Sequence, residues 1–247
     1  MITIPIYVIN LKRATKRLDY ISDQFLKNKI SFKRIDAIEG AKLPKSELNN
    51  HKNKSKYSLS HYTSLSNGEI GCSLSQRKSW GIAAESNYRA TIVLEDDVKI
   101  SNKFSSIIQT LYENMDKNIV IDLKGKKGFF ELERLNLPNG INLIHYSTPP
   151  LGTQGAIFGR NAASNLLNKV KGFEAPIDNL MQKIYQHKVE IWSLEQGCIT
   201  HETEASGGAS IIRSIGIFQK IFNELVRPFW RTYVKIKNLV YHKFLSQ

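Results

Sequence analysis

The sequence predicts an α/β fold, because two kinds of pattern alternate along residues 4–194. Short apolar segments rich in β-branched residues, such as 90–98, have the composition of strands that are covered on both faces. Between them, apolar residues recur at helical spacing, and in 13–28 they predict a buried face made of Leu18, Ile21, Phe25 and Leu26. Strands that alternate with helices are typical of a sheet with helices packed against it.

The elements can be assigned in chain order from these patterns. Strands are expected at 4–11, 32–38, 90–98, 119–123, 142–146, 154–158 and 189–194. Helices are expected at 13–28, 73–86, 104–115, 160–170 and 176–186. We expect the polar segment 40–66 to be a long loop with a short helix near 45–48, and 125–139 to be a second loop. Loops as long as 40–66 often cover active sites.

Composition limits the class of protein. A chain of 247 residues, 41% of them hydrophobic, is long enough for one large domain with a substantial core. Its two cysteines, Cys72 and Cys198, fit no zinc-binding spacing and allow at most one disulfide, which favours a reducing compartment. Residues 1–11 lack the pattern of a signal peptide, and no run approaches the roughly 18 apolar residues of a membrane-spanning helix. We therefore expect a cytoplasmic protein.

The net charge of +13 is concentrated at the two ends of the chain. Residues 1–60 carry a net +8 and residues 213–247 a net +6, whereas the middle of the chain is nearly neutral. Basic proteins bind nucleic acid, anionic lipid or phosphorylated ligands. The sequence has no zinc finger, no aromatic RNP motif and no heptads after a basic region, so nucleic acid is not an expected partner.

Residues 213–247 are expected to form a separate helical segment after a catalytic domain at 1–212. Apolar and aromatic residues recur there at helical spacing on both sides of Pro228, and five basic residues accompany them: Arg227, Arg231, Lys235, Lys237 and Lys243. A basic amphipathic helix with aromatic residues fits the surface of a membrane that contains anionic lipid. The alternative is a C-terminal helix that packs on the core and keeps its basic face in solvent. We favour the membrane, because so many of the aromatic residues are expected to be exposed.

Three carboxylates end the strand expected at 90–98, and they are the strongest indication of chemistry. Because side chains alternate along a strand, Glu95 and Asp97 are expected on one face and Asp96 on the other. Two carboxylates on one face repel each other unless a cation lies between them, and ligands of open α/β sheets bind at the carboxyl ends of strands. The run therefore indicates Mg²⁺ or Mn²⁺ held by oxygen ligands. An acidic turn or a helix N-terminus would have a similar composition.

Four segments together resemble glycosyltransferase family 25, the bacterial lipooligosaccharide sugar transferases. They are 6–13 with Arg17, 34–40, 68–75 leading into 94–98, and 152–158 followed by 176–178. The sequence departs from the family at Gln76, where a histidine usually follows Leu74 and Ser75. Glutamine keeps the hydrogen-bonding capacity of histidine but does not titrate.

The resemblance implies a GT-A-like fold, an α/β sandwich with a nucleotide-binding half. It implies inverting transfer of a hexose from a UDP-sugar, galactose before glucose, to a lipooligosaccharide or LPS acceptor at the inner membrane. It also implies Mn²⁺ or Mg²⁺ at a DxD-type motif, with Asp97 as a metal ligand and Glu95 as a supporting ligand or ribose contact. His201 could complete the metal shell, although a surface histidine is an equal alternative.

Further donor contacts are expected near the first two strands. Arg13 and Arg17 lie at the start of the first helix, where a helix N-terminus and two guanidinium groups suit a diphosphate or uridine. A solvated basic face is the alternative. Asp36 could accept a hydrogen bond from uracil or ribose, or it could simply cap a turn. Asn10, from the first segment, and Asp96 complete the expected donor-binding set.

Inverting transfer needs a general base for the acceptor hydroxyl. The resemblance favours Asp178, although its place at a helix start makes N-capping a strong alternative. Other candidates are Asp122, Glu69, Asp96 and Glu202. Two rival functions remain open at this point: a nucleotidyl- or phosphotransferase that uses the same acidic strand end, and an inactive module that binds sugar or a lipid surface.

Overall fold

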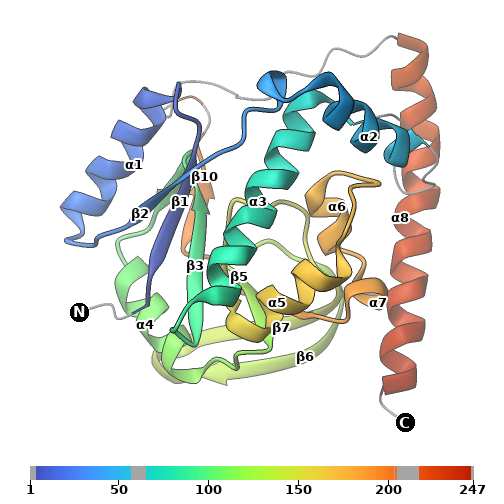
Figure 1. The fold of residues 1–247 in the computed structure, drawn as a ribbon. Coiled ribbons are helices and arrows are strands. Elements are labelled where there is room, and N and C mark those ends of the chain that lie inside the picture. Colours follow the sequence, from blue (N-terminus) through green and yellow to red (C-terminus); the bar gives the residue numbers. More distant parts are fainter. Residues whose placement is uncertain (1–3, 57–64, 203, 205–216, 246–247) are drawn as a thin grey trace.

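The computed structural model describes residues 4–56, 65–202, 204 and 217–245, and the protein folds around a mixed eight-stranded sheet (Figure 1). The strand order is β2-β1-β3-β8-β5-β9-β7-β6. The strands are β1 (Ile6–Asn10), β2 (Lys33–Asp36), β3 (Ala90–Glu95), β5 (Ile119–Asp122), β6 (Phe129–Leu137), β7 (Ile141–Thr148), β8 (Gly155–Gly159) and β9 (Glu190–Leu194). A small antiparallel pair, β4 (Val98–Ile100) and β10 (Ile199–His201), lies beside it.

The α-helices are α1 (Thr15–Lys27), α2 (Lys45–Lys56), α3 (Asn67–Glu85), α4 (Phe104–Asn114), α5 (Arg160–Lys169), α6 (Ile177–Met181), α7 (Ile184–His187) and α8 (Ile217–Leu245). Two 3₁₀ turns, η1 (Gly40–Lys42) and η2 (Pro138–Gly140), follow β2 and β6. The expected mixed α/β fold is therefore confirmed.

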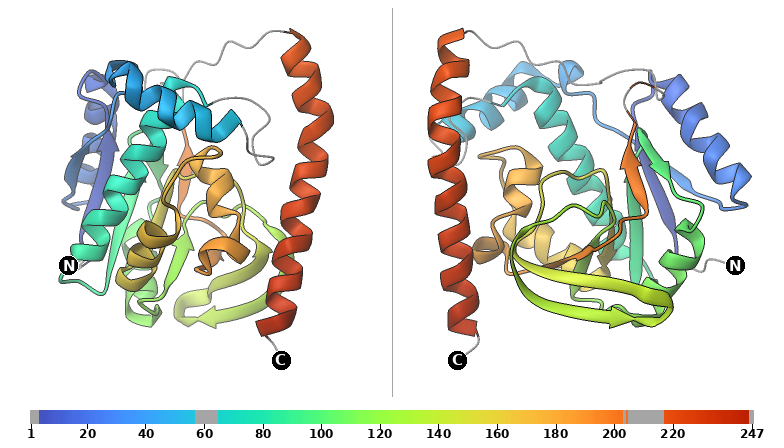
Figure 2. Two further views of the ribbon diagram at one scale, coloured as in Figure 1. Left: turned by 45° about the vertical axis from the view of Figure 1, so that its right-hand side comes forward. Right: turned by 180° about the vertical axis from the view of Figure 1, so that it is seen from behind.

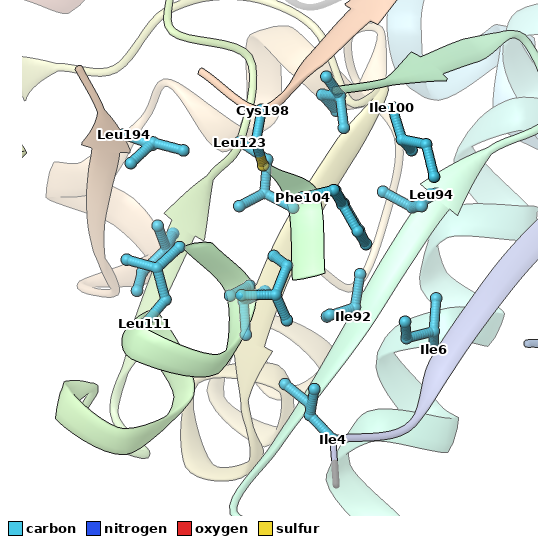
Figure 3. Close-up of a cluster of buried hydrophobic side chains, with 14 of the residues drawn as sticks. Ile4, Ile6, Ile92, Leu94, Ile100, Phe104, Leu111, Leu123, Leu194 and Cys198 are labelled. Atoms are coloured by element: carbon cyan, nitrogen blue, oxygen red, sulfur yellow. The ribbon is translucent and has the colours of Figure 1, made fainter. Parts of the chain in front are cut away.

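Helices cover both faces of the sheet, and each face has its own core. Side chains of α1 and α4 pack on one face of the sheet. Ile92 and Leu94 of β3 lie on this face, in one cluster with Phe104 of α4 (Figure 3). On the other face α3, α5, α6 and α7 pack against the opposite side of the strands, where Val93 points. β3 is thus buried on both sides, as its continuous apolar sequence predicts.

The direction of β8 determines where the chemistry-bearing residues meet. β8 is antiparallel to both of its neighbours, so that Gly155 lies opposite Leu94 and Ala156 lies opposite Asp122. β1, β2 and β3 are parallel to one another. The carboxyl ends of β1, β2, β3 and β5 and the amino end of β8 therefore lie along one edge of the sheet.

The segment expected as a loop at 125–139 contains a strand, so that prediction is wrong. β6 is the edge strand, its side chains are mostly exposed, and it pairs with β7 through a tight turn in which Asn139 and Gly140 have positive φ angles of 62° and 69°. An exposed edge strand has no buried side to produce an apolar pattern. Its pairing with β7 makes it a strand, and composition alone does not show that.

Helix boundaries also differ from those expected. α2 has 12 residues, where only a short helix at 45–48 was expected. α3 begins at Asn67, because Ser66 and Glu69 form a capping box that was not recognised in the sequence. The helix expected at 176–186 is divided into α6 and α7. In α1 the buried face is made by Arg17, Ile21 and Phe25, while Leu26 is 78% exposed, contrary to expectation.

α8 lies along the opposite side of the molecule from α1 and packs against β7 and α7 (Figures 1 and 2). Its contact face includes Val234 and Asn238, which are fully or nearly fully buried. The Asn238 amide donates hydrogen bonds to Thr148 Oγ1 (2.9 Å) and to the Gln182 carbonyl (2.8 Å). α8 is continuous through Pro228, although a proline inside a helix costs about 3 kcal/mol.

The boundary expected at 212/213 falls outside the described residues. Among the helices of the described residues, none is both long enough and apolar enough to cross a membrane.

Candidate functional site

A cavity of about 240 Å³ opens at the carboxyl edge of the sheet. Its walls come from the ends of β1 and β3, the segment after β2, the start of α1 and one side of α3. The lining includes most of the residues expected to bind the donor, namely Arg13, Arg17, Glu95, Asp96 and Asp97, together with Gln76. The fold thus brings these residues together from segments that are far apart in the sequence.

The three carboxylates do not alternate as expected, because β3 ends at Glu95 and a turn follows. Nη1 of Arg17 donates to Asp96 Oδ1 and to Asp97 Oδ2, both at 2.9 Å. The Asn10 amide donates to the other oxygen of Asp96 at 2.6 Å. Asp96 and Asp97 therefore share one cation, and Glu95 makes different contacts. The rule of alternation does not apply past the last residue of a strand.

One oxygen of Asp97 is arranged differently from the other. Oδ1 is buried and accepts no hydrogen bond from the described residues, and Nδ1 of His201 lies 3.5 Å from it. His201 reaches this position because β10 pairs with β4 directly after the acidic turn, with His201 opposite Val98. A carboxylate oxygen and an imidazole nitrogen that face each other can serve as two ligands of a divalent cation.

The described residues contain no group of three or more His, Cys, Asp and Glu side chains that could hold a metal by themselves. Mg²⁺ commonly binds through one or two carboxylates and completes its shell with water and substrate phosphates. Asp97 and His201 fit that kind of site and do not fit a cage made entirely of protein ligands.

Glu95 lies between two hydrogen-bond donors on neighbouring segments. Thr153 Oγ1 donates to its Oε1 at 2.8 Å, and Gln76 Nε2 donates to the same oxygen at 3.1 Å. Burial, reinforced by the negative charge of Asp97, raises the pKa of Glu95 to about 7, although both hydrogen bonds oppose the shift. Gln76 also donates to the Thr153 carbonyl at 3.3 Å, so it links α3 to the segment before β8.

Asp36 and Arg34 lie beside this cavity. The side chain of Asp36 is 71% exposed, pairs with Arg34 Nη2 at 2.8 Å and is absent from the residues that line the cavity. Arg34 also donates from Nε to Asn10 Oδ1 at 2.9 Å. Asn10 thus joins Arg34 to Asp96, and its contacts support the acidic turn.

The opposite wall of the cavity depends on two glycines. α3 approaches the segment after β2 so closely that a Cβ on Gly71 would lie 2.5 Å from the Ile38 carbonyl oxygen and 2.6 Å from the Gly40 nitrogen. Gly40 in turn packs against the backbone at Asn67. These backbone contacts hold the segment that carries Ile38 to Ala41 against the cavity.

A second cavity, of about 410 Å³, adjoins the first and shares Cys72 and Glu95 with it. Asp178 of α6 and Arg227, Trp230 and Arg231 of α8 contribute to its walls. The two cavities therefore meet at the side chain of Glu95.

Asp178 is half-buried in the second cavity, and its Oδ1 accepts a hydrogen bond from the Asn179 backbone N–H at 2.9 Å. Burial raises its pKa, although this hydrogen bond and the positive charge of Lys124 act in the opposite direction. Asp178 lies inside α6 and does not cap it, since the N-cap position is Pro176.

Three of the other candidate bases have carboxylates in structural contacts. Asp122 forms a buried ion pair with Lys124 at 3.2 Å. Asp96 is held by Asn10 and Arg17, and Glu69 accepts hydrogen bonds from Ser66 in the capping box. Glu202 donates its backbone N–H to the Asp97 carbonyl and is half-buried.

Comparison with known proteins identifies the family. A model described as glycosyltransferase family 25 (LPS biosynthesis protein) matches residues 3–181. The chain is 27% identical to a putative glycosyltransferase of Haemophilus influenzae over 184 residues, which is 73% of this chain and 64% of that protein. It is 33% identical to human procollagen galactosyltransferase 2 over 191 residues, which is 73% of this chain and 30% of the human protein.

The chain belongs to glycosyltransferase family 25. The resemblance drawn from four sequence segments is thereby confirmed. The matched residues 3–181 run from β1 to α6, so they include the first cavity, the acidic turn and Asp178, but neither His201 nor α8. The chain spans 64% of the bacterial relative's length and 19–32% of the length of the animal relatives.

Two features of this family 25 site were missed from the sequence. Gln76 was noted only as a departure from the family pattern, yet it bonds to Glu95 and Thr153. Thr153 was not singled out, although it makes the shorter hydrogen bond to Glu95. The quoted segment 152–158 contains Thr153, but no local pattern indicates that a threonine before a strand will face a carboxylate from another strand.

Proposed function

We propose that this protein is an inverting, metal-dependent glycosyltransferase that moves a hexose from a UDP-sugar to a lipooligosaccharide or LPS acceptor. The observation that carries the proposal is the pair of cavities that meet at Glu95. One contains Asp97 near His201 and the other contains Asp178. Separate cavities with a common wall suit a donor and an acceptor, whereas hydrolysis of a nucleotide needs only one cavity. The name of the human relative favours galactose over glucose as the hexose, and the family description favours an LPS acceptor.

The first cavity would bind the UDP-sugar in a GT-A-like arrangement, at the carboxyl ends of parallel strands. Arg13 lies at the mouth of this cavity, paired with Glu39 at 2.7 Å, where it can exchange that partner for a phosphate. Arg17 is bonded to two aspartates, which favours a role in holding the acidic turn. Glu95 would contact the ribose or support the metal from the end of β3.

Asp97 and His201 would hold Mn²⁺ or Mg²⁺. When bound, such a cation neutralises negative charge on the diphosphate of the departing UDP. Arg17 keeps Asp97 Oδ2 occupied, so that Oδ1 is the oxygen directed toward His201. The hydrogen bond from the Asn10 amide to Asp96 stabilises the same turn.

Asp178 would act as the general base in the second cavity. The acceptor hydroxyl oxygen attacks the anomeric carbon of the hexose, and its proton passes to the Asp178 carboxylate. The bond between that carbon and the UDP oxygen breaks, and the electron pair leaves with UDP. Attack from the side opposite the leaving group inverts the anomeric configuration.

The exposed face of α8 supports a position at the inner membrane. Six exposed apolar side chains recur along it at steps of three or four residues: Leu225, Phe229, Tyr233, Ile236, Val240 and Phe244. We name this row the apolar stripe of α8. Two exposed lysines, Lys237 and Lys243, lie beside the stripe, as expected of a helix that rests on anionic lipid. A glycolipid acceptor would then reach the second cavity from the same side of the protein.

The experiment that tests this function measures UDP binding and hexose transfer with a panel of UDP-sugars, in Mn²⁺ and in EDTA. We expect binding of UDP that depends on Mn²⁺ and is lost in Asp97→Asn, which keeps the side-chain shape but removes the charge. Asp19→Asn, on the exposed side of α1, is the matched control and should behave as wild type. Equal UDP binding by wild type and Asp97→Asn would contradict the metal site, and no UDP binding at all would contradict the transferase.

A further inference from the structure

A third cavity, of about 370 Å³, contains an unusual concentration of positive charge. Four of its lining residues are cationic: Lys126, Lys127, Arg231 and Lys235. No acidic residue lines it, and among the described residues none of the four has a carboxylate partner within ion-pair distance. We name this cavity, with its four cationic side chains, the basic cavity.

The basic cavity adjoins the second cavity. Arg231 and Gln182 line both, as Glu95 and Cys72 line both the first and the second. The three cavities therefore follow one another: the first cavity, where the donor is proposed to bind, then the second cavity with Asp178, and then the basic cavity. A molecule that occupies the second cavity and extends away from the donor meets the four cations next.

Two distant segments build the basic cavity, and contacts of α8 hold it beside β6 and β7. Lys126 and Lys127 precede the edge strand β6, whereas Arg231 and Lys235 lie one turn apart on α8. Lys235 Nζ lies 4.2 Å from the centroid of the Phe129 ring, which holds its ammonium group over β6. Asn238 ties the next turn of α8 to Thr148 and Gln182. The tertiary structure thus brings the four cations together from two segments, so they are not simply the solvent-exposed basic face of one helix.

We propose that the basic cavity binds a phosphate group carried by a sugar of the acceptor. This inference rests on the proposed function, since it extends the acceptor site from Asp178 toward α8. Four cations that have no carboxylate at ion-pair distance among the described residues attract anions to the cavity. Arginine and lysine donate charge-assisted hydrogen bonds to phosphate oxygens, which are stronger than those to a neutral hydroxyl. The site would select a phosphorylated glycan and fix its direction along the three cavities.

A lipid headgroup could supply the same phosphate chemistry, but the structure favours the glycan. None of the six residues of the apolar stripe of α8 lines the basic cavity. The part of α8 suited to lipid and the part that carries Arg231 and Lys235 are therefore different sides of the helix.

The test uses the full chain with glucose 6-phosphate and glucose as soluble probes, and vesicles of phosphatidylglycerol as the lipid probe. We expect glucose 6-phosphate to bind about tenfold or more tightly than glucose, the size expected of one or two charge-assisted hydrogen bonds. The double variant Arg231→Gln/Lys235→Gln should lose that preference. Lys237→Gln/Lys243→Gln, on the same helix but outside the cavity, should keep it.

Lys127→Gln tests the opposite wall of the cavity without altering α8, and it should also weaken glucose 6-phosphate binding. Three results would overturn the inference: glucose 6-phosphate bound no better than glucose, equal losses in the test and control pairs, or a loss confined to the vesicles. UDP binding in Mn²⁺ is measured on the same samples. If wild type does not bind UDP, the proposed function alone is overturned. If the variants still bind UDP, they are folded.

Discussion

Nη1 of Arg17 lies 2.9 Å from Oδ2 of Asp97, and the two side chains are only 8% and 9% exposed. The same nitrogen contacts Asp96, so a single buried guanidinium balances two adjacent carboxylates. Because Arg17 is in the first turns of α1 and Asp97 follows β3, this contact joins the first helix to the acidic turn. It leaves the other oxygen of Asp97 directed toward His201.

Arg17→Met should destabilise the protein strongly. The change keeps much of the apolar stem but leaves Asp96 and Asp97 buried without their cation, which typically costs about 3–5 kcal/mol. Urea denaturation gives the free energy of unfolding. Lys16→Met, at the neighbouring exposed position on α1, should change it by less than about 0.5 kcal/mol. If both variants lose the same small amount, the ion pairs of Arg17 do not stabilise the acidic turn.

Asp178→Asn should reduce hexose transfer about 10²- to 10⁴-fold while leaving Mn²⁺-dependent UDP binding intact, because only the proton acceptor is removed. The base must be ionised to accept a proton, and burial raises the pKa of Asp178. Wild-type kcat/KM should therefore fall as the pH falls, at a higher pH than for an ordinary aspartate. Steady-state kinetics across pH measure this. Transfer by Asp178→Asn at the wild-type rate would rule out this residue as the base.

Gly71→Ala should destabilise the wall of the first cavity, since its Cβ would lie 2.5 Å from the Ile38 carbonyl oxygen. A clash with backbone costs about 1–3 kcal/mol, and the displaced segment should also weaken UDP binding. Gly81→Ala on the same helix is the matched control, because a Cβ there meets no atom within 4 Å. It should stabilise the protein by about 0.5–1 kcal/mol. Thermal unfolding and UDP titration of both variants check the pair, and a stabilising Gly71→Ala would refute the close approach.

The double variant Phe229→Ser/Phe244→Ser should bind vesicles of phosphatidylglycerol about tenfold or more weakly than wild type, because two exposed aromatic side chains of α8 are lost. Co-sedimentation measures the bound fraction. Leu26→Ser removes an equally exposed apolar side chain from α1, on the other side of the molecule, and should have no effect. Equal losses in both variants, or no vesicle binding by wild type, would contradict a membrane-facing α8.

Much of the first cavity could be predicted from the sequence, since it depends on local patterns. β1 and β3 are strongly apolar and β-branched; Arg13 and Arg17 follow β1, and the acidic run ends β3. Residues that follow parallel strands meet at one edge of the sheet, so their proximity could be inferred without coordinates. The role of each of these residues could not be predicted from the sequence. Whether Arg17 faces a ligand or two aspartates depends on the turn after Glu95, and that turn has no distinctive composition.

The sequence by itself determined the family, the alternation of strands and helices, and the segments that supply the first cavity. Only the tertiary structure decided which side of the molecule α8 occupies, that β6 is an edge strand, and that Lys126 and Arg231 line one cavity. The physical reason is that apolar periodicity reports how one segment buries its own side chains. Contacts between segments about a hundred residues apart depend on how the whole sheet is assembled, and that information is not contained in any single window of the chain.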